Sequence, residues 1–203
     1  MLLVNRRGDV NNGFYAMLLR MKHINRWGIM HSLIPDKLST HSLEVAFIAH
    51  ALAFIGNDIF GKSYDPDRIA VKAMYHDVPE IFTGDIPTPV KYYSEDTRAS
   101  YKAVEDAAVE KLKKMLPDEL KNDYSDMFEH TPEEKKLIKA ADRLSAYIKC
   151  REECRYGSNE FIDAGTRLID TLREMKCREA DYFLDNFLEA FDLPIDSILS
   201  NDD

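Results

Sequence analysis

The sequence predicts an all-α fold, a helical bundle around one central buried helix. No part of the 203 residues shows sustained alternation of apolar and polar side chains, the pattern of a half-buried strand. Segment 40–60 is apolar on nearly all sides, which indicates a helix in the middle of the core. Residues 131–134, Thr-Pro-Glu-Glu, form a capping box with proline at the first helical position, a signal for a helix start.

The N-terminal half is expected to contain three helices. The first ten residues are predicted to be frayed, and 12–23 to form an amphipathic helix, followed by Gly28 as a left-handed terminator. Ser39 or Thr40 is expected to cap the central helix.

The third of these helices starts at Asp65, an N-cap followed by Pro66 at the first helical position. We expect it to continue past His76, to break near Pro79 and to close at Gly84.

Residues 85–93 contain two prolines and are predicted to form an ordered loop rather than a helix. Ser94 should begin a long helix to about 115, and Pro117 a short one. The helix after Thr131 should end near Gly157, and two closing helices are expected over 159–176 and 178–191. A polar tail is expected over 194–203.

Composition favours one domain spanning 1–203 and a cytoplasmic protein. Apolar residues make up 45% of the chain, enough for a substantial core, and the net charge is −9. That charge argues against nucleic-acid polymers or a membrane surface as partners, since both require basic patches. We find no run of 18 apolar residues and no secretory signal, and three cysteines suit a reducing compartment.

One stretch places His76, Asp77 and Glu80 on the stripe that Ile69 and Ala73 begin, if the helix is continuous. Burying three polar groups there costs free energy unless they are paired or bound. A divalent metal ion would satisfy all three; a buried histidine–aspartate hydrogen bond is the alternative. His41 and Asp142 are further polar groups on apolar helix faces.

The order His…His-Asp…Asp on an all-helical chain resembles the HD-domain metal phosphohydrolases. The resemblance narrows to the bacterial 5′-deoxynucleotidase family and covers most of the chain. The motifs that carry it are Ile24-Asn25-Arg26-Trp27, His41-Ser42-Leu43, Tyr75-His76-Asp77 with Glu80, Thr83-Gly84-Asp85-Ile86-Pro87-Thr88-Pro89-Val90-Lys91-Tyr92, and Ala140-Ala141-Asp142.

This resemblance implies an HD-domain bundle that holds one divalent ion such as Co²⁺, Mn²⁺ or Zn²⁺. The implied metal ligands are His41, His76, Asp77 and Asp142, and the alternative is a structural polar network of the same residues. The implied catalytic residues are Glu80, Asp77 and Arg26. Glu80 would act as general base on water; alternatively, it only orients His76.

The implied substrate-binding residues are Arg26, Trp27, Asp77, Asp85, Ile86, Pro87, Thr88 and Asp142. Arg26 has the fork geometry for a phosphate. Trp27, the only tryptophan, would exclude a 2′-hydroxyl, although core packing is the ordinary role of a lone tryptophan. Asp85 would accept from the sugar 3′-hydroxyl; its alternative role is that of a turn residue.

The predicted function is therefore hydrolysis of deoxyribonucleoside 5′-monophosphates by a metal-dependent phosphoric monoester hydrolase. The resemblance also implies a homodimer. Two alternatives remain open: another HD phosphohydrolase acting on nucleoside triphosphates or cyclic nucleotides, and a non-catalytic nucleotide-binding helical protein. A triphosphate site should show more basic side chains near the ligands than Arg26 and Arg143 supply.

Overall fold

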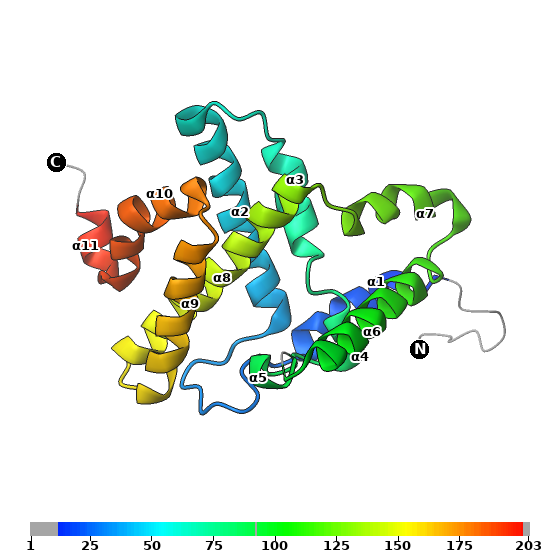
Figure 1. Ribbon diagram of the computed structural model, residues 1–203, viewed down its shortest axis with the longest axis horizontal. Helices are drawn as coiled ribbons and strands as arrows, with labels where there is room; N and C mark the ends of the chain where they lie inside the picture. Colours follow the sequence, from blue (N-terminus) through cyan, green and yellow to red (C-terminus); the bar gives the residue numbers. More distant parts are fainter. Residues whose placement is uncertain (1–11, 92, 201–203) are drawn as a thin grey trace, which may run out of the picture.

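The computed structural model describes residues 12–91 and 93–200, and every regular element in these ranges is helical (Figure 1). A single bridge between Asn25 and Lys37 is the one β-type pairing recorded for this part of the chain. The all-α prediction is confirmed. The first ten residues and Tyr92, for which predictions were made, lie outside the described residues, as do 201–203.

The longer helices form the frame of the molecule. They are α2 (Leu38–Phe60), α6 (Glu95–Lys113), α8 (Pro132–Arg155) and α9 (Ile162–Glu174). The shorter ones are α1 (Phe14–Leu18), α3 (Pro66–Met74), α4 (Glu80–Thr83), α5 (Thr88–Lys91), α7 (Asp118–Ser125), α10 (Arg178–Phe187) and α11 (Ile195–Leu199). Turns of 3₁₀ helix cover Leu19–His23, Asp126–Phe128, Asn159–Phe161 and Leu188–Asp192.

Helix α2 is the centre of the main core, as predicted, and packs against α3, α8 and α10 (Figure 1). Val45, Ala49 and Leu52 on α2 and Leu144 on α8 are completely buried in this core. The helix begins at Leu38 with Lys37 as N-cap, so the prediction of Ser39 or Thr40 as its cap is wrong. Packing fixes the start, because the buried Leu38 donates its N–H to the carbonyl of Ile24.

One face of α2 is not buried, contrary to the expectation that its apolar surface is covered all round. Leu43, Phe47 and Phe54 are 46%, 67% and 47% exposed and follow one another at helical spacing. Among the described helices α2 alone has the length and composition of a membrane span, with a mean hydropathy of 1.5. Its place between α3, α8 and α10 accounts for an apolar composition without a membrane.

A second apolar cluster joins the N-terminal elements to the middle of the chain. Phe14 and Met21 pack with Val78, Leu112 and Leu116, and α1 lies beside α6 in Figure 1. The helix predicted over 12–23 is real but divided, because α1 ends at Leu18 and a 3₁₀ turn replaces its second half.

The helix expected to carry His76 ends earlier than predicted. Helix α3 stops at Met74, and 75–79 form turns in which the N–H groups of Tyr75, His76 and Val78 each bond the carbonyl three residues back. Pro79 explains this change, since its ring would clash with the carbonyl four residues before and it disfavours a helical Val78. His76 therefore stands on a turn, not on a helix face, and Pro79 becomes the N-cap of α4.

Local signals gave correct helix starts where side chains cap the backbone. Asp65, Ser94 and Thr131 each accept a backbone N–H as predicted, and Thr131 with Glu134 completes the capping box. One proline prediction is wrong: residues 88–91 form the single turn α5, and Pro89 fits there because the N–H it lacks would have no partner in the first turn of a helix. Within the predicted polar tail, Ile195–Leu199 form α11.

A buried ion pair ties α8 to the loop before α2. Glu153 is completely buried and accepts from Ser32 Oγ at 2.6 Å and from the N–H groups of Leu33 and Ile34, both at 2.9 Å. Lys149, one turn earlier, donates to Glu153 and to the Ile34 carbonyl. Residues 32–34 are thereby fixed to the C-terminal half of α8.

Candidate active site

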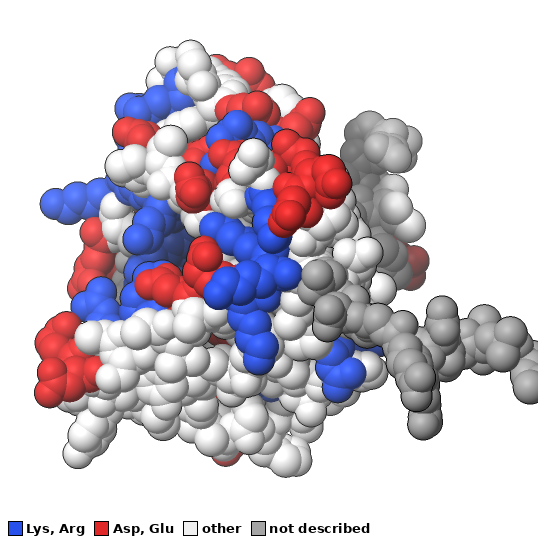
Figure 2. Space-filling view, turned by 90° about the vertical axis from the view of Figure 1, so that its right-hand side faces the viewer, with Lys and Arg blue, Asp and Glu red and all other residues white. Residues whose placement is uncertain are grey.

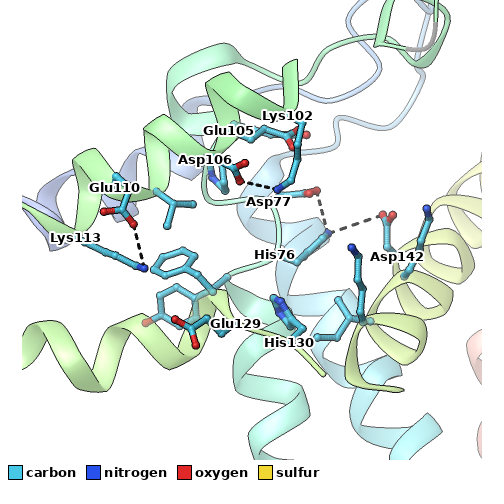
Figure 3. A pocket seen from close by; sticks show the side chains of 18 of the residues that line it. His76, Asp77, Lys102, Glu105, Asp106, Glu110, Lys113, Glu129, His130 and Asp142 are labelled. Atoms are coloured by element: carbon cyan, nitrogen blue, oxygen red, sulfur yellow. Dashed lines mark hydrogen bonds and ion pairs between the residues drawn. The ribbon is translucent and has the colours of Figure 1, made fainter. Parts of the chain in front are cut away.

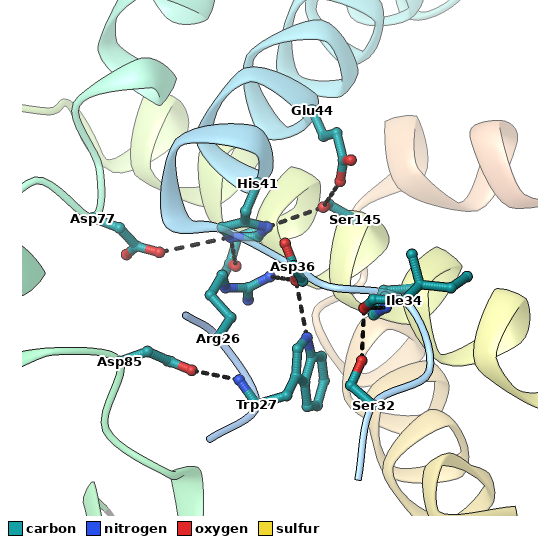
Figure 4. A network of polar contacts seen from close by, with 12 residues as sticks. Arg26, Trp27, Ser32, Ile34, Asp36, His41, Glu44, Asp77, Asp85 and Ser145 are labelled. Atoms are coloured by element: carbon teal, nitrogen blue, oxygen red, sulfur yellow. Dashed lines mark hydrogen bonds and ion pairs between the residues drawn. The ribbon is translucent and has the colours of Figure 1, made fainter. Parts of the chain in front are cut away.

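The first polar side chain of the site is His41, which the first turns of α2 bury completely. Its Nε2 lies 3.1 Å from Asp142 Oδ1, and its Nδ1 lies 3.0 Å from Ser145 Oγ, which donates to Glu44 (Figure 4). Because a carboxylate only accepts, the serine proton goes to Glu44, and Ser145 must accept from Nδ1–H. In the neutral ring this arrangement turns the Nε2 lone pair of His41 toward the two aspartates, whereas the protonated ring donates from Nε2 to Asp142.

His76 has the same tautomer for a different reason. Its Nδ1 lies 2.7 Å from the carbonyl of Ala73, which can only accept, so Nδ1 carries the proton in the neutral ring. Its Nε2 is 3.0 Å from Asp77 Oδ2 and 3.9 Å from Asp142 Oδ1, yet it is buried without a hydrogen bond of acceptable geometry. A buried nitrogen without a partner points to a ligand.

The turn after α3 and the middle of α8 bring the two carboxylates to these imidazoles (Figure 3). His41, His76, Asp77 and Asp142 each offer one ligand atom, and the four atoms all lie within 4.8 Å of one another. Two imidazole nitrogens and two carboxylate oxygens suit a borderline divalent ion. The four side chains therefore fit such an ion.

The pKa values of these groups follow from their mutual contacts. Burial alone would lower the pKa of His76, but Asp77 and then Asp142 outweigh it and raise that pKa to about 9. Burial would raise the pKa of Asp77, but His76 and His41 hold it well below its usual range. The pKa of Asp142 is lowered against burial by the hydrogen bond with His41.

Glu80, the first residue of α4, lies on the wall of the cavity next to these ligands. Burial, followed by the negative charges of Asp77 and Asp85, raises the pKa of Glu80 to about 9, although Lys91 and Arg26 oppose the shift. A cation held by the neighbouring ligands would act in the opposite direction and favour the carboxylate.

Arg26 and Trp27 are held together by one oxygen of Asp36 (Figure 4). Asp36 Oδ2 accepts from Arg26 Nη1 at 2.8 Å and from Trp27 Nε1 at 3.0 Å. The guanidinium is 10% exposed and its Nε is buried without a partner, so it retains donors for an anion. Burial would lower the pKa of Arg26, but Asp36, then Asp142 and Asp77, outweigh it and raise that pKa.

Trp27 has a left-handed backbone, with φ of 61°, whereas Gly28 does not, so the prediction of Gly28 as terminator is wrong. A left-handed backbone is costly for a bulky residue and is typical of functional sites. Its N–H donates to Asp85 Oδ2 at 2.9 Å, and its ring packs edge-on against Phe161 at 5.2 Å. Trp27 thus has both the packing role and a place beside Arg26.

A cavity of about 640 Å³ opens beside His76, Asp77 and Asp142, with α6 as its opposite wall (Figure 3). Five lysines line it: Lys91, Lys102, Lys113, Lys135 and Lys139. Charged side chains of both signs gather around a hollow on the corresponding side of the molecule (Figure 2). Ile86, Pro87 and Thr88 are not part of this wall: the first two lie in the connection from α4 to α5, and Thr88 is the first residue of α5.

Sequence reasoning missed Asp36, Ser145 and Glu44 and gave Lys91 no role. Lys91 is half-buried, lines the cavity and binds Glu105 at 2.6 Å. A lone aspartate in a loop carries no spacing signal, whereas Glu44 and Ser145 follow His41 and Asp142 by three residues each, a helical spacing that places them beside the ligands.

The chain has the fold of HD-domain phosphohydrolases of known structure. An HD-domain phosphohydrolase from Listeria innocua matches with a TM-score of 0.77 and 23% identity over 88% of this chain and 87% of its own. A cyanophage S-2L HD phosphohydrolase, solved with dA and one catalytic Zn²⁺, matches with a TM-score of 0.65 and 19% identity over 86% and 96%. At such identities these likenesses establish the fold.

The family follows from closer relatives. Residues 13–191 match the model of the YfbR-like 5′-deoxynucleotidases. The chain is 48% identical to a 5′-deoxynucleotidase of Vibrio parahaemolyticus over 91% of this chain and 97% of the relative. It is 46% identical to the 5′-deoxynucleotidase YfbR of Escherichia coli over 91% and 94%. The chain belongs to the YfbR-like 5′-deoxynucleotidase family.

Proposed function

We propose that the chain is a metal-dependent 5′-deoxynucleotidase that releases phosphate from deoxyribonucleoside 5′-monophosphates. Family membership supports this activity. The observation that carries the proposal is the approach of four ligand atoms to within 4.8 Å of one another, with the charge of Arg26 acting on two of the carboxylates.

His41, His76, Asp77 and Asp142 would hold one divalent ion, such as Co²⁺, Mn²⁺ or Zn²⁺. When bound, such an ion polarises a phosphoryl oxygen and lowers the pKa of a coordinated water. The chain contributes the ligand geometry: Ser145 and the Ala73 carbonyl fix both imidazoles with Nε2 toward the aspartates. Asp77 and Asp142, on the cavity wall, also belong to the proposed substrate-binding set.

Glu80 is the proposed general base. The oxygen of the attacking water bonds to phosphorus and gives a proton to Glu80 while the bond between phosphorus and the 5′-oxygen breaks, and the leaving 5′-oxygen receives that proton from Glu80. Its place on the cavity wall, next to Asp77, supports this role. Asp77 and Arg26 complete the proposed catalytic set.

Arg26 is proposed to bind the phosphate through its remaining donors, and Trp27 to form the wall near C2′. Asp85 uses Oδ2 for the Trp27 N–H, which leaves Oδ1 to accept from the sugar 3′-hydroxyl. Ile86 and Pro87, in the connection after Asp85, and Thr88, at the start of α5, would contact the nucleotide. Base identity is expected to matter little, because the sequence contains no dedicated base-reading motif.

A nucleoside-triphosphate phosphohydrolase is the second candidate, and the lysines of the cavity favour it. Of the five, Lys91, Lys102 and Lys113 are engaged by Glu105, Asp106 and Glu110. Lys135 and Lys139 also line the wall.

Phosphate release from a panel of deoxy- and ribonucleoside mono-, di- and triphosphates, with Co²⁺, Mn²⁺ and Zn²⁺ in turn, separates the candidates. Preference for deoxynucleoside monophosphates is expected. A preference for triphosphates would replace the proposal. Metal analysis of the Asp77→Ala variant adds a second readout, because loss of a ligand should empty the site.

We also propose that 1–203 is a single domain acting in the cytoplasm as a homodimer. The exposed stripe of Leu43, Phe47 and Phe54 on α2 offers apolar surface to a second copy. Sedimentation velocity of the wild type and of Phe47→Ser tests this, and a monomeric wild type would refute the dimer.

A further inference from the structure

Asp36 lies outside every motif that identifies the family, yet it contacts both residues proposed to read the substrate. It stands in the loop just before α2 with its side chain 9% exposed. One atom, Oδ2, accepts from both Arg26 Nη1 and Trp27 Nε1. Arg26, proposed to donate to the phosphate, and Trp27, proposed to lie against the sugar, are therefore both bound by a single oxygen atom.

The backbone keeps Asp36 in register with this pair. The N–H of Arg26 donates to the Asp36 carbonyl at 3.0 Å, next to the bridge between Asn25 and Lys37. The carboxylate is thus fixed relative to the two side chains it holds, and not merely close to them.

The Trp27 ring packs against the apolar cluster around Phe161, and its bond to Asp36 is the directional polar contact of the ring. Asp85 holds the backbone N–H at a φ of 61°, and Phe161 meets the ring edge-on. An indole has a single N–H donor, so the Nε1 bond to Asp36 determines how the ring turns about its two side-chain torsions.

Arg26 needs the same contact for an electrostatic reason. Its guanidinium is buried and is also attracted by Asp77 and Asp142, the proposed metal ligands. Without Asp36, Asp142 and Asp77 would exert the strongest remaining attraction on the positive charge, ahead of Asp85. The guanidinium would then turn toward the ligands and away from an incoming phosphate.

We propose that Asp36 is the positioning residue that sets phosphate binding and sugar discrimination together, an inference that rests on the proposed function. Because the two donors share one atom, they cannot be reoriented independently. Replacing Asp36 should lower deoxynucleotide turnover and the preference for deoxy over ribo substrates in the same variant.

The variants are Asp36→Ala, which removes the acceptor, and Asp36→Asn, which retains an acceptor but loses the charge. Asp58→Asn, at an exposed position near the end of α2, is the control for the same change in charge. The kcat/KM for a matched deoxy- and ribonucleoside monophosphate pair is measured with each protein. Because Trp27 is the only tryptophan, its emission and its quenching by acrylamide report directly on the ring.

In Asp36→Ala we expect deoxynucleotide kcat/KM to fall roughly 10- to 100-fold, the range for lost hydrogen bonds to charged groups. The deoxy/ribo ratio should fall by about 10-fold. Quenching of Trp27 by acrylamide should increase in Asp36→Ala. In all three measurements Asp36→Asn should lie between Asp36→Ala and the wild type, and Asp58→Asn should match the wild type. General destabilisation would lower kcat/KM for the deoxy and the ribo substrate alike and leave the deoxy/ribo ratio unchanged.

An unchanged deoxy/ribo ratio in folded Asp36→Asn, or unchanged quenching in Asp36→Ala, would overturn the role of Asp36. A wild type that releases no phosphate from any monophosphate would instead overturn the proposed function. In that case, quenching in the Asp36 variants still decides whether this carboxylate holds the indole.

Discussion

Metal binding should release protons, and their number follows from the contacts of His76. Asp77 and Asp142 raise the pKa of His76 to about 9, so at pH 7 the metal-free imidazole carries a proton on Nε2. A metal ligand must offer that nitrogen as a lone pair. Loading the site at pH 7 therefore displaces about one proton from this side chain.

The sign and the size of the pH dependence follow. The metal-free form is stabilised by protonation below the raised pKa, so apparent metal affinity should rise with pH until about 9 and then level off. Between pH 7 and pH 9 the association constant should grow about tenfold per unit, on the order of 3 kcal/mol in all.

Isothermal titration calorimetry with Zn²⁺ in two buffers of different ionisation enthalpy counts the protons. Glu80, whose pKa is also raised to about 9, can release a second proton when a cation approaches, so Glu80→Gln isolates the contribution of His76. We expect one to two protons from the wild type and about one from Glu80→Gln. No proton release from Glu80→Gln at pH 7, with affinity independent of pH, would refute the reasoning.

Further predictions concern catalysis, selectivity and stability. Glu80→Gln should lose on the order of 10²–10⁴-fold in kcat while metal still binds, and retained turnover would exclude a general base there. Trp27→Ala should reduce the preference for deoxy over ribo substrates by roughly 1–3 kcal/mol, measured as the ratio of their kcat/KM values. Arg26→Ala should lower kcat/KM for both substrates alike and leave that ratio unchanged. Glu153→Gln leaves the charge of Lys149 buried without its partner and should cost roughly 3–5 kcal/mol in urea unfolding. Burial alone would raise the pKa of Glu153, but hydrogen bonds with Lys149 and Ser32 outweigh burial and lower that pKa to about 2. The stabilisation is therefore complete above about pH 4.5 and should disappear as pH falls toward 2. Acid unfolding of the wild type and of Glu153→Gln measures this loss.

Capping residues and the ligand motif could be predicted because their signals are local. Thr131 and Ser94 satisfy backbone donors three residues away, so the sequence itself contains both partners. The family pattern predicted His41, His76, Asp77 and Asp142 as metal ligands, and the structure brings these four side chains together. The argument from a shared helix face was wrong, since α3 ends before His76.

Features decided by tertiary contacts could not be predicted. The start of α2 depends on Leu38 being buried against the N-terminal elements, and the left-handed backbone of Trp27 depends on Asp85, 58 residues away. Asp36 lacks any periodic context, and its role becomes visible only when the loop places its carboxylate between two donors.

Helix α8 connects the proposed metal ligands to the loop that contains Asp36. Asp142 lies in its middle, and Glu153, eleven residues on, holds residues 32–34. An α-helix rises 1.5 Å and turns 100° per residue, so the eleven residues fix an axial distance of about 16 Å and a definite rotation between Asp142 and Glu153. One residue inserted there would rotate Glu153 away from the loop while leaving each ligand intact. The number of residues between Asp142 and Glu153 therefore determines how the loop containing Asp36 lies relative to the proposed metal ligands.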